Sequence, residues 1–201
     1  MMQLPINIDY TGKVVVVTGA GGLICGAMAR AFAQSGAKVA ALDLNEDKVK
    51  ELANEIKSYG YICEGYKANV LEPNSLKEVH AKILEDLGPC DILINGAGGN
   101  NQKAMPTITK YDERELTGEL PEGQKGLYDI DMDAFRSVLD INIMGTVIPT
   151  MEFAKQMVKK GGGSVINFAS MNSYCPLTRC FAYAMSKAAI SNLTQSFAAY
   201  Y

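Results

Sequence analysis

Residues 13–26 read KVVVVTGAGGLICG, and this stretch decides the fold. Its first six residues form a short β-branched run without polar alternation, which is typical of a strand buried on both faces of a parallel sheet. Glycines interrupt the run, and apolar residues then recur near helical spacing from Gly22 to Ser35, where Gly36 ends the pattern. The stretch therefore predicts a strand, a tight turn and a helix.

The same alternation of strand and helix continues along the chain. Strands that alternate with helices are joined by right-handed crossovers, which place helices on both faces of one parallel sheet. The sequence therefore predicts a doubly wound, three-layer α/β fold of the Rossmann type. Further strands are predicted at 39–43, 61–68, 91–95 and 164–169, and further helices at 46–58, 74–87, 131–160 and 181–201.

The periodicity disappears between residues 99 and 130. This segment is rich in Gly, Pro, Thr, Lys and Glu, and Pro106 and Pro121 are among its breakers. Structureless loops longer than about 12–15 residues are uncommon in compact domains. We therefore expect either a functional lid or a mobile insertion here, and the sequence does not choose between them.

Composition excludes several classes of protein. A chain of 201 residues, 48% of them hydrophobic and 20% charged, can bury one core, so residues 1–201 are expected to form a single domain. A net charge of -3 without a basic cluster argues against nucleic-acid binding. The five cysteines lie in apolar segments without C-x-x-C pairs, which predicts free thiols, a reducing compartment and no metal site.

The sequence also bears on where the protein resides. Residues 1–10 carry no basic region followed by an apolar run, so no secretion signal is predicted. No later stretch approaches the roughly 20 apolar residues that a membrane span needs. A soluble, cytoplasmic protein is the expectation.

The turn between the first strand and the first helix is a candidate dinucleotide site. Glycines allow a tight turn and let phosphates approach the backbone at the positive end of the helix. A glycine-rich turn alone is weak evidence, but its place between a strand and a helix favours pyrophosphate binding. The predicted contacts are Gly19, Gly21, Gly22, Leu23, Ile24 and Gly26.

Asp43 ends the second predicted strand, 24 residues after Gly19. A carboxylate at this point can accept hydrogen bonds from the adenosine ribose hydroxyls and would repel a 2'-phosphate. No Arg or Lys lies within the glycine turn or directly after Asp43, so NAD is predicted as the cofactor in preference to NADP. The alternative is that Asp43 caps the following helix.

A Y-x-x-x-K element, Tyr183 to Lys187, lies on the last predicted helix, and Ser170 ends the fifth strand thirteen residues before the tyrosine. Residues i and i+4 share a helix face, which places the lysine ammonium beside the phenol. Keeping a phenol with an ordinary pKa of about 10 ready as a base near pH 7 costs about 4 kcal/mol. A unit charge about 4 Å away supplies about that much at an effective dielectric near 20.

With Asn95-Gly96-Ala97-Gly98 after the fourth strand and Asn142 in the long helix, the chain resembles the short-chain dehydrogenase/reductase family. The resemblance implies an NAD-dependent enzyme that moves hydride between nicotinamide and a hydroxyl or carbonyl substrate. It implies that Tyr183 transfers the hydroxyl proton and that Ser170 hydrogen-bonds the developing alkoxide. Lys187 would favour the phenolate and hold the nicotinamide ribose.

The resemblance also assigns supporting roles. Asn142 would help a water relay protons from the lysine, and the alternative is a purely structural hydrogen bond on an apolar helix face. Tyr183 and Lys187 would contact the cofactor as well as the substrate. The other implied cofactor contacts are Asn95, Ala97, Gly98, Asn69 and Val70, the last two beside the adenine.

The chain departs from the family pattern at three places. Its glycine turn is one residue longer before the last glycine than T-G-x-x-x-G-x-G, and Asn69 stands where an aspartate is more common. The family's last two parallel strands are missing after Tyr201. The strand at 164–169 is therefore expected to have an open edge, unless something else covers it.

The glycine turn, Gly98-Gly99-Asn100 and the long loop look most like the D-mannonate oxidoreductase, or fructuronate reductase, branch of the family. That branch interconverts the keto group and the alcohol of a sugar acid. The alternatives are a 3-oxoacyl or other carbonyl substrate, and a truncated fragment that binds NAD without turnover. The resemblance also implies that the apolar-sided helices at 131–160 and 181–201 pack against those of a second copy, as in this family's oligomers, so a homodimer or homotetramer is expected.

Overall fold

The computed structural model of the chain describes residues 8–175 and 177–201. Residues 1–7, in which no secretion signal is predicted, lie outside the described residues. The contacts divide the chain into two compact units, which are described separately. The first unit comprises the chain up to Ala97 together with Gly145–Asn167, and the second comprises Gly98–Met144 and Phe168–Tyr201.

The first unit is built on one parallel sheet. Its strand order is β3-β2-β1-β4-β5, with Val16 in register with Ala40 on one side and with Leu93 on the other. The reversal of strand order about β1 confirms the doubly wound, Rossmann-like parallel sheet. The strands are β1 (Val14–Thr18), β2 (Lys38–Asp43), β3 (Cys63–Lys67), β4 (Ile92–Asn95) and β5 (Ser164–Asn167).

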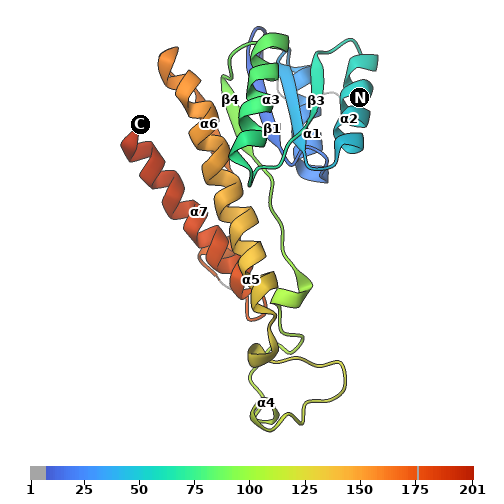
Figure 1. Cartoon of the computed structure of the whole chain (residues 1–201), viewed down its shortest axis with the longest axis vertical. Coiled ribbons are helices and arrows are strands. Elements are labelled where there is room, and N and C mark those ends of the chain that lie inside the picture. Colours follow the sequence, from blue (N-terminus) through green and yellow to red (C-terminus); the bar gives the residue numbers. More distant parts are fainter. Residues whose placement is uncertain (1–7, 176) are drawn as a thin grey trace. The chain divides into compact units, whose positions relative to one another are not determined.

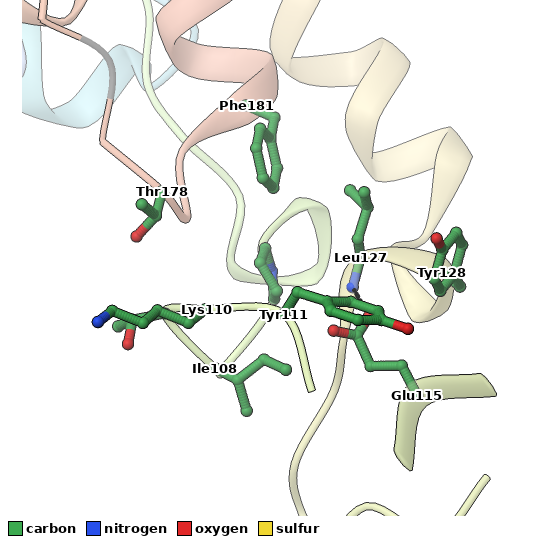
Figure 2. Close-up of a pocket in the computed structure, with 10 residues that line it drawn as sticks. Ile108, Lys110, Tyr111, Glu115, Leu127, Tyr128, Thr178 and Phe181 are labelled. Atoms are coloured by element: carbon green, nitrogen blue, oxygen red, sulfur yellow. Dashed lines mark hydrogen bonds between the residues drawn. The ribbon is translucent and has the colours of Figure 1, made fainter. Parts of the chain in front are cut away.

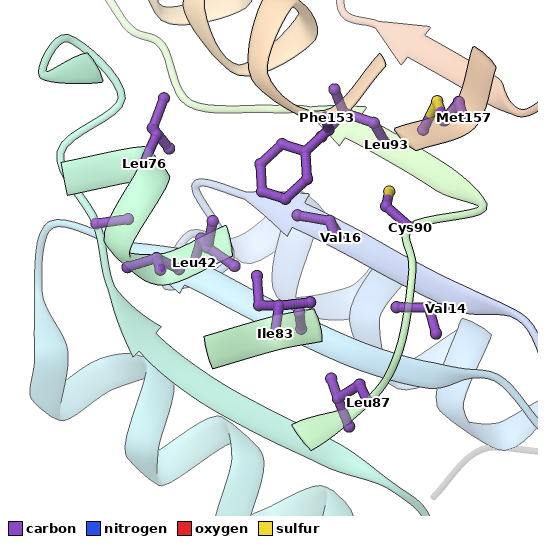
Figure 3. Packing of buried hydrophobic residues seen from close by; sticks show 13 residues of the cluster. Val14, Val16, Leu42, Leu76, Ile83, Leu87, Cys90, Leu93, Phe153 and Met157 are labelled. Carbon is purple, nitrogen blue, oxygen red and sulfur yellow. The ribbon is translucent and has the colours of Figure 1, made fainter. Parts of the chain in front are cut away.

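Helices cover both faces of this sheet (Figure 1). The face that carries Val16, Leu42 and Leu93 packs against α3 and α6 through a continuous apolar cluster that includes Phe153 (Figure 3). Val15 and the alternate residues of its neighbours point to the other face, where α1 and α2 contact β1 and β2. The helices are α1 (Leu23–Gln34), α2 (Glu46–Ser58), α3 (Pro73–Asp86) and α6 (Gly145–Lys159).

The second unit is mainly helical. Its small core consists of Ala104, Ala134, Val138 and Ala182, with Tyr183 packed against it. Its helical elements are η1 (Gln102–Ala104), α4 (Arg114–Thr117), η2 (Leu127–Asp129), α5 (Met132–Leu139), the π-helical η3 (Asp140–Met144), η4 (Met171–Ser173) and α7 (Phe181–Tyr200).

One predicted helix is wrong in detail, and the predicted long loop contains short helical elements. The predicted helix 131–160 is interrupted by the π-helical turn η3, because the Asn142 side chain donates a hydrogen bond of 2.9 Å to the Val138 carbonyl. In a regular α-helix the backbone N–H of residue 142 would use that carbonyl. The segment 99–130 is not structureless either, since it contains η1, α4 and η2.

Strand β5 lies at one edge of the described sheet. Among the described residues β5 pairs with β4 alone, and Ile166 is exposed at that end of the sheet. The strand is shorter than the predicted 164–169, because pairing stops at Asn167.

No helix within residues 8–175 and 177–201 is long and apolar enough to cross a bilayer.

Candidate active site

The glycine turn of the first unit lies where the sequence places it, between β1 and α1. Gly19 has φ +69°, and a Cβ there would stand 2.8 Å from the Ala97 nitrogen and from the Gly96 oxygen. Gly19 therefore cannot be replaced without moving the backbone after β4. α1 begins at Leu23 without a side-chain cap and has no acidic residue in its first turn. The N–H groups of Leu23 and Ile24 in this first turn can receive an anion.

The predicted apolar contacts of the turn are open to solvent. Leu23 is 93% exposed and Ile24 is 66% exposed, at the start of a helix whose other face is buried. Exposed apolar side chains at this place leave the backbone N–H groups accessible. Gly26 is buried in α1, and a Cβ there would lie 3.1 Å from the Ala20 oxygen, so its role is close packing of the helix onto the turn.

A residue outside the predicted set holds the turn together. The buried Thr18 hydroxyl accepts hydrogen bonds from the N–H groups of Gly96 (3.1 Å) and Ala97 (3.2 Å), and it lies 3.4 Å from the Ile94 carbonyl. It thus joins the end of β1 to the chain that follows β4. The signal that could have found it is its position directly before Gly19.

Asp43 ends β2 beside the glycine turn. One carboxylate oxygen accepts a hydrogen bond of 3.0 Å from Gly21 N–H, and the other accepts one of 2.9 Å from Asn45 N–H. The cap of α2 is Asn45, whose side chain accepts from Lys48 N–H. The alternative that Asp43 caps this helix is therefore wrong, and its carboxylate stands at the turn.

Two basic residues that sequence reasoning missed lie beside this turn. A shallow pocket of about 300 Å³ next to Gly21 and Gly22 is lined by Arg30 and Lys48, among others. Arg30 is neutralised there by two hydrogen bonds to Glu55. Lys48 makes no ion pair within the described part of the chain. No local sequence signal points to either residue, because helix packing alone brings them to the turn.

The other residues of the first unit that are predicted to contact the cofactor mainly interact with neighbouring residues of the fold. Asn95 is buried, and its amide donates to Thr150 (2.9 Å) and to Asn167 (2.9 Å). Asn69 accepts a hydrogen bond from Leu71 N–H (3.1 Å) at the entry to α3, and Val70 is buried. Their predicted contact with the cofactor stays a prediction.

Lys187 and Tyr183 meet on α7, in the second unit. The lysine Nζ lies 5.6 Å from the centroid of the Tyr183 ring. It donates a hydrogen bond of 2.7 Å to the Phe168 carbonyl, and the residue is buried, with 8% of its surface exposed. The burial and the fixed hydrogen bond keep the positive charge next to the phenol ring, as the i, i+4 spacing predicts.

Asn142 and Gly98 are placed beside this pair. The Asn142 amide donates to Gly99 C=O (2.8 Å) and accepts from Gly99 N–H (3.1 Å), so it binds both backbone polar groups of Gly99. A Cβ added to Gly98 would lie 2.5 Å from the Asn142 oxygen and 4.0 Å from Lys187 Nζ. Only a residue without a side chain fits where these two polar groups converge.

Ser170 begins η4, an element that packs against α7. Its hydroxyl accepts a hydrogen bond of 3.2 Å from Asn172 N–H, which orients the side chain. Ser170 and Tyr183 make no hydrogen bond with each other within the described residues. The second unit therefore holds Asn142, Ser170, Tyr183 and Lys187 on elements that contact one another. No cluster of three or more metal-ligating side chains occurs among the residues described.

The chain is similar to known oxidoreductases. The model of the family "short chain dehydrogenase" matches residues 13–201. An uncharacterized oxidoreductase of Haemophilus influenzae is 42% identical over 200 residues, which are 100% of this chain and 68% of the relative. The uncharacterized oxidoreductase UxuB of Bacillus subtilis is 35% identical over 99% of this chain and 69% of its own length.

Solved structures agree with this similarity. The crystal structure of a proposed D-mannonate oxidoreductase from Haemophilus influenzae with bound NAD has a TM-score of 0.91 and 42% identity, over 96% of this chain and 68% of that chain. The structure of an NAD-bound xylitol dehydrogenase has a TM-score of 0.78 and 29% identity, over 93% of this chain and 64% of that chain.

Proposed function

Because the chain belongs to the short-chain dehydrogenase family, we propose that it is an NAD-dependent oxidoreductase whose substrate is a sugar acid of the D-mannonate/D-fructuronate kind. The observation that carries the catalytic part is the buried Lys187 ammonium, held 5.6 Å from the Tyr183 ring centroid next to Asn142 and Gly98. The substrate class is supported by the similarity to the proposed D-mannonate oxidoreductase.

The residues present fit NAD. The uncapped start of α1 offers N–H groups to a pyrophosphate, and no acidic side chain stands in that first turn to repel it. Asp43 offers carboxylate oxygens to ribose hydroxyls at the edge of the same turn. NAD, when bound, supplies the hydride acceptor for the alcohol or the hydride donor for the carbonyl.

The protein's own side chains handle the proton. Tyr183 takes the proton of the substrate hydroxyl during oxidation and returns it during reduction. Lys187 stabilises the phenolate by its charge, and Phe168 C=O keeps the ammonium in place. Ser170 donates a hydrogen bond to the substrate oxygen. Asn142 holds the peptide of Gly99, and thereby the turn in which Gly98 leaves room beside the lysine.

The test is Tyr183→Phe, assayed by NADH absorbance with D-mannonate. Removal of the proton-transfer group should lower kcat/KM about 10²- to 10⁴-fold. NAD binding, measured by calorimetry, should persist. Tyr59→Phe is the matched control, because Tyr59 is an exposed tyrosine at the end of α2. Tight NAD binding by the unsubstituted chain without turnover of sugar acids would contradict the proposed activity, as would full activity of Tyr183→Phe.

A further inference from the structure

The segment 99–130 and the start of α7 enclose a pocket of about 360 Å³ within the second unit. None of Ser170, Tyr183, Lys187 or Asn142 lines it. Figure 2 shows Phe181 reaching from the start of α7 towards the loop, with Tyr111 and Leu127 across from it. The volume falls at the lower end of the range of small-molecule sites, and apolar walls of this kind are typical of such sites.

The walls of this pocket are held by specific hydrogen bonds. The Glu115 carboxylate accepts from Leu127 N–H (2.7 Å) and from Asp112 N–H (3.3 Å), so it ties two parts of the segment together. Gly126 leaves the space that the Glu115 side chain occupies, because a Cβ at Gly126 would collide with it. Arg179 donates a hydrogen bond of 2.9 Å to the Pro106 carbonyl, which fixes the segment to the residues before α7.

The charged residues that line this pocket indicate which kind of ligand it would bind. Glu115 already accepts two backbone N–H groups. Lys110 also belongs to the pocket lining, and its exposed side chain makes no hydrogen bond or ion pair with any described residue. A second hollow of about 510 Å³ on the same segment shares Lys110 in its lining but adds two acids, Asp112 and Glu122, so an anion is disfavoured there. The pocket under Phe181 has one base and one acid in its lining, and its lining is therefore the less negative of the two.

We propose that this pocket binds the carboxylate end of a small organic acid, with Lys110 as its counter-ion and Tyr111, Leu127 and Phe181 against its carbon chain. The proposal rests on the proposed function, because the acid in question is the substrate of the enzyme. Segment 99–130 is then the part of the chain that selects acids over neutral polyols, and Arg179 positions it relative to the helix that carries Tyr183.

The test measures binding in the 201-residue chain carrying Tyr183→Phe, which does not turn the ligand over. D-mannonate is the probe and calorimetry in the presence of NAD is the readout. Adding Lys110→Met should raise the Kd about tenfold, the factor that corresponds to one hydrogen bond to a charged group. Lys110→Arg should restore the Kd. Lys125→Met is the matched control, an exposed lysine on the same segment outside both hollows.

The outcomes separate the two proposals. A Kd equal in the Lys110→Met and Lys125→Met variants overturns the carboxylate pocket, and so does a failure of D-mannonate to bind at millimolar concentration. Equal Kd values leave the proposed function intact, whereas a failure to bind also removes D-mannonate as its substrate. The oxidoreductase activity itself fails only if the unsubstituted chain shows no NAD-dependent turnover that depends on Tyr183. In the active chain, Lys110→Met should raise KM for the acid and leave kcat and the KM for NAD unchanged.

Discussion

At the scale of single residues, Asp43 combines two roles in one carboxylate. It accepts hydrogen bonds from Gly21 N–H and Asn45 N–H, and it presents negative charge at the turn that is proposed to bind the cofactor. Arg30, which could attract a phosphate, is held by Glu55, while Lys48 is exposed and without an ion pair in the described chain. The charge balance at the turn therefore depends on Asp43.

Asp43→Asn should shift the cofactor preference towards NADP. The amide keeps an oxygen for one of the two backbone N–H groups and removes a repulsion of about 1–4 kcal/mol between unit charges about 4 Å apart. The ratio of kcat/KM for NADP to that for NAD should rise about tenfold or more. Steady-state kinetics with both cofactors measures the ratio. Asp47→Asn, an exposed acid in the first turn of α2, is the control. An unchanged ratio in Asp43→Asn would remove Asp43 from the cofactor site.

At the scale of elements, α3 and α6 are joined by a buried polar pair. His80 Nδ1 lies 2.8 Å from a Glu152 oxygen, and the His80 ring packs against Phe153 in a tilted arrangement with centroids 4.6 Å apart. Burial raises the pKa of Glu152, but hydrogen bonds from His80 and Lys155 outweigh burial, so the pKa lies below its ordinary value. A lowered pKa means that the charged carboxylate stabilises the folded state.

The stabilising effect of this pair should depend on pH. Because the pKa of Glu152 is lower in the folded state, its contribution is complete above the ordinary glutamate pKa of about 4.3 and is lost as the pH falls through the folded-state value. Glu152→Gln should lower the free energy of unfolding by about 1–3 kcal/mol at pH 7. The difference in the free energy of unfolding between this variant and the unsubstituted chain should become smaller below about pH 4.

Urea unfolding at pH 7, 5 and 3.5 measures this difference. Glu78→Gln, an exposed glutamate on α3, should show no such trend. A Glu152→Gln difference that stays constant from pH 7 to pH 3.5 would mean that the carboxylate charge contributes nothing to the packing of α6 on α3.

At the scale of the whole molecule, the five cysteine thiols differ in how deeply they are buried. Cys25, Cys63 and Cys90 are buried, and burial raises the pKa of Cys63 and of Cys90 to about 12. Cys175 is exposed, which corrects the expectation that all five lie in apolar surroundings, because it sits in the loop between η4 and α7 and not in a core element. All five are free thiols.

A thiol reagent at pH 8 should therefore modify the folded protein unevenly. Cys175 should react within seconds to minutes, since its thiol is exposed to the reagent. Cys63 and Cys90 should react only after denaturation, because they are both buried and protonated. Peptide mapping by mass spectrometry identifies each site, with Cys175→Ser as the control. Labelling of Cys63 in native buffer as fast as Cys175 would show that β3 is not buried in solution.

Local patterns were sufficient to predict most of the fold. The β-branched run at β1, the glycine turn and the helix after it follow from the spacing of apolar residues and from the turn chemistry of glycine. The bounds of α2 agree with the predicted 46–58, because its apolar period and its ends are both local features. The same reasoning found Tyr183 and Lys187, since four residues along a helix bring two side chains to one face.

The tertiary structure decided what depends on residues far apart in the chain. Only folding brings Gly98 to Asn142 and Lys187, and Lys110 to Phe181, because no sequence period relates them. It also excluded the capping role that was the alternative for Asp43, since Asn45 caps α2. Hydrogen bonds and packing between distant segments depend on how elements pack in three dimensions, whereas sequence periodicity records only the neighbours along one element.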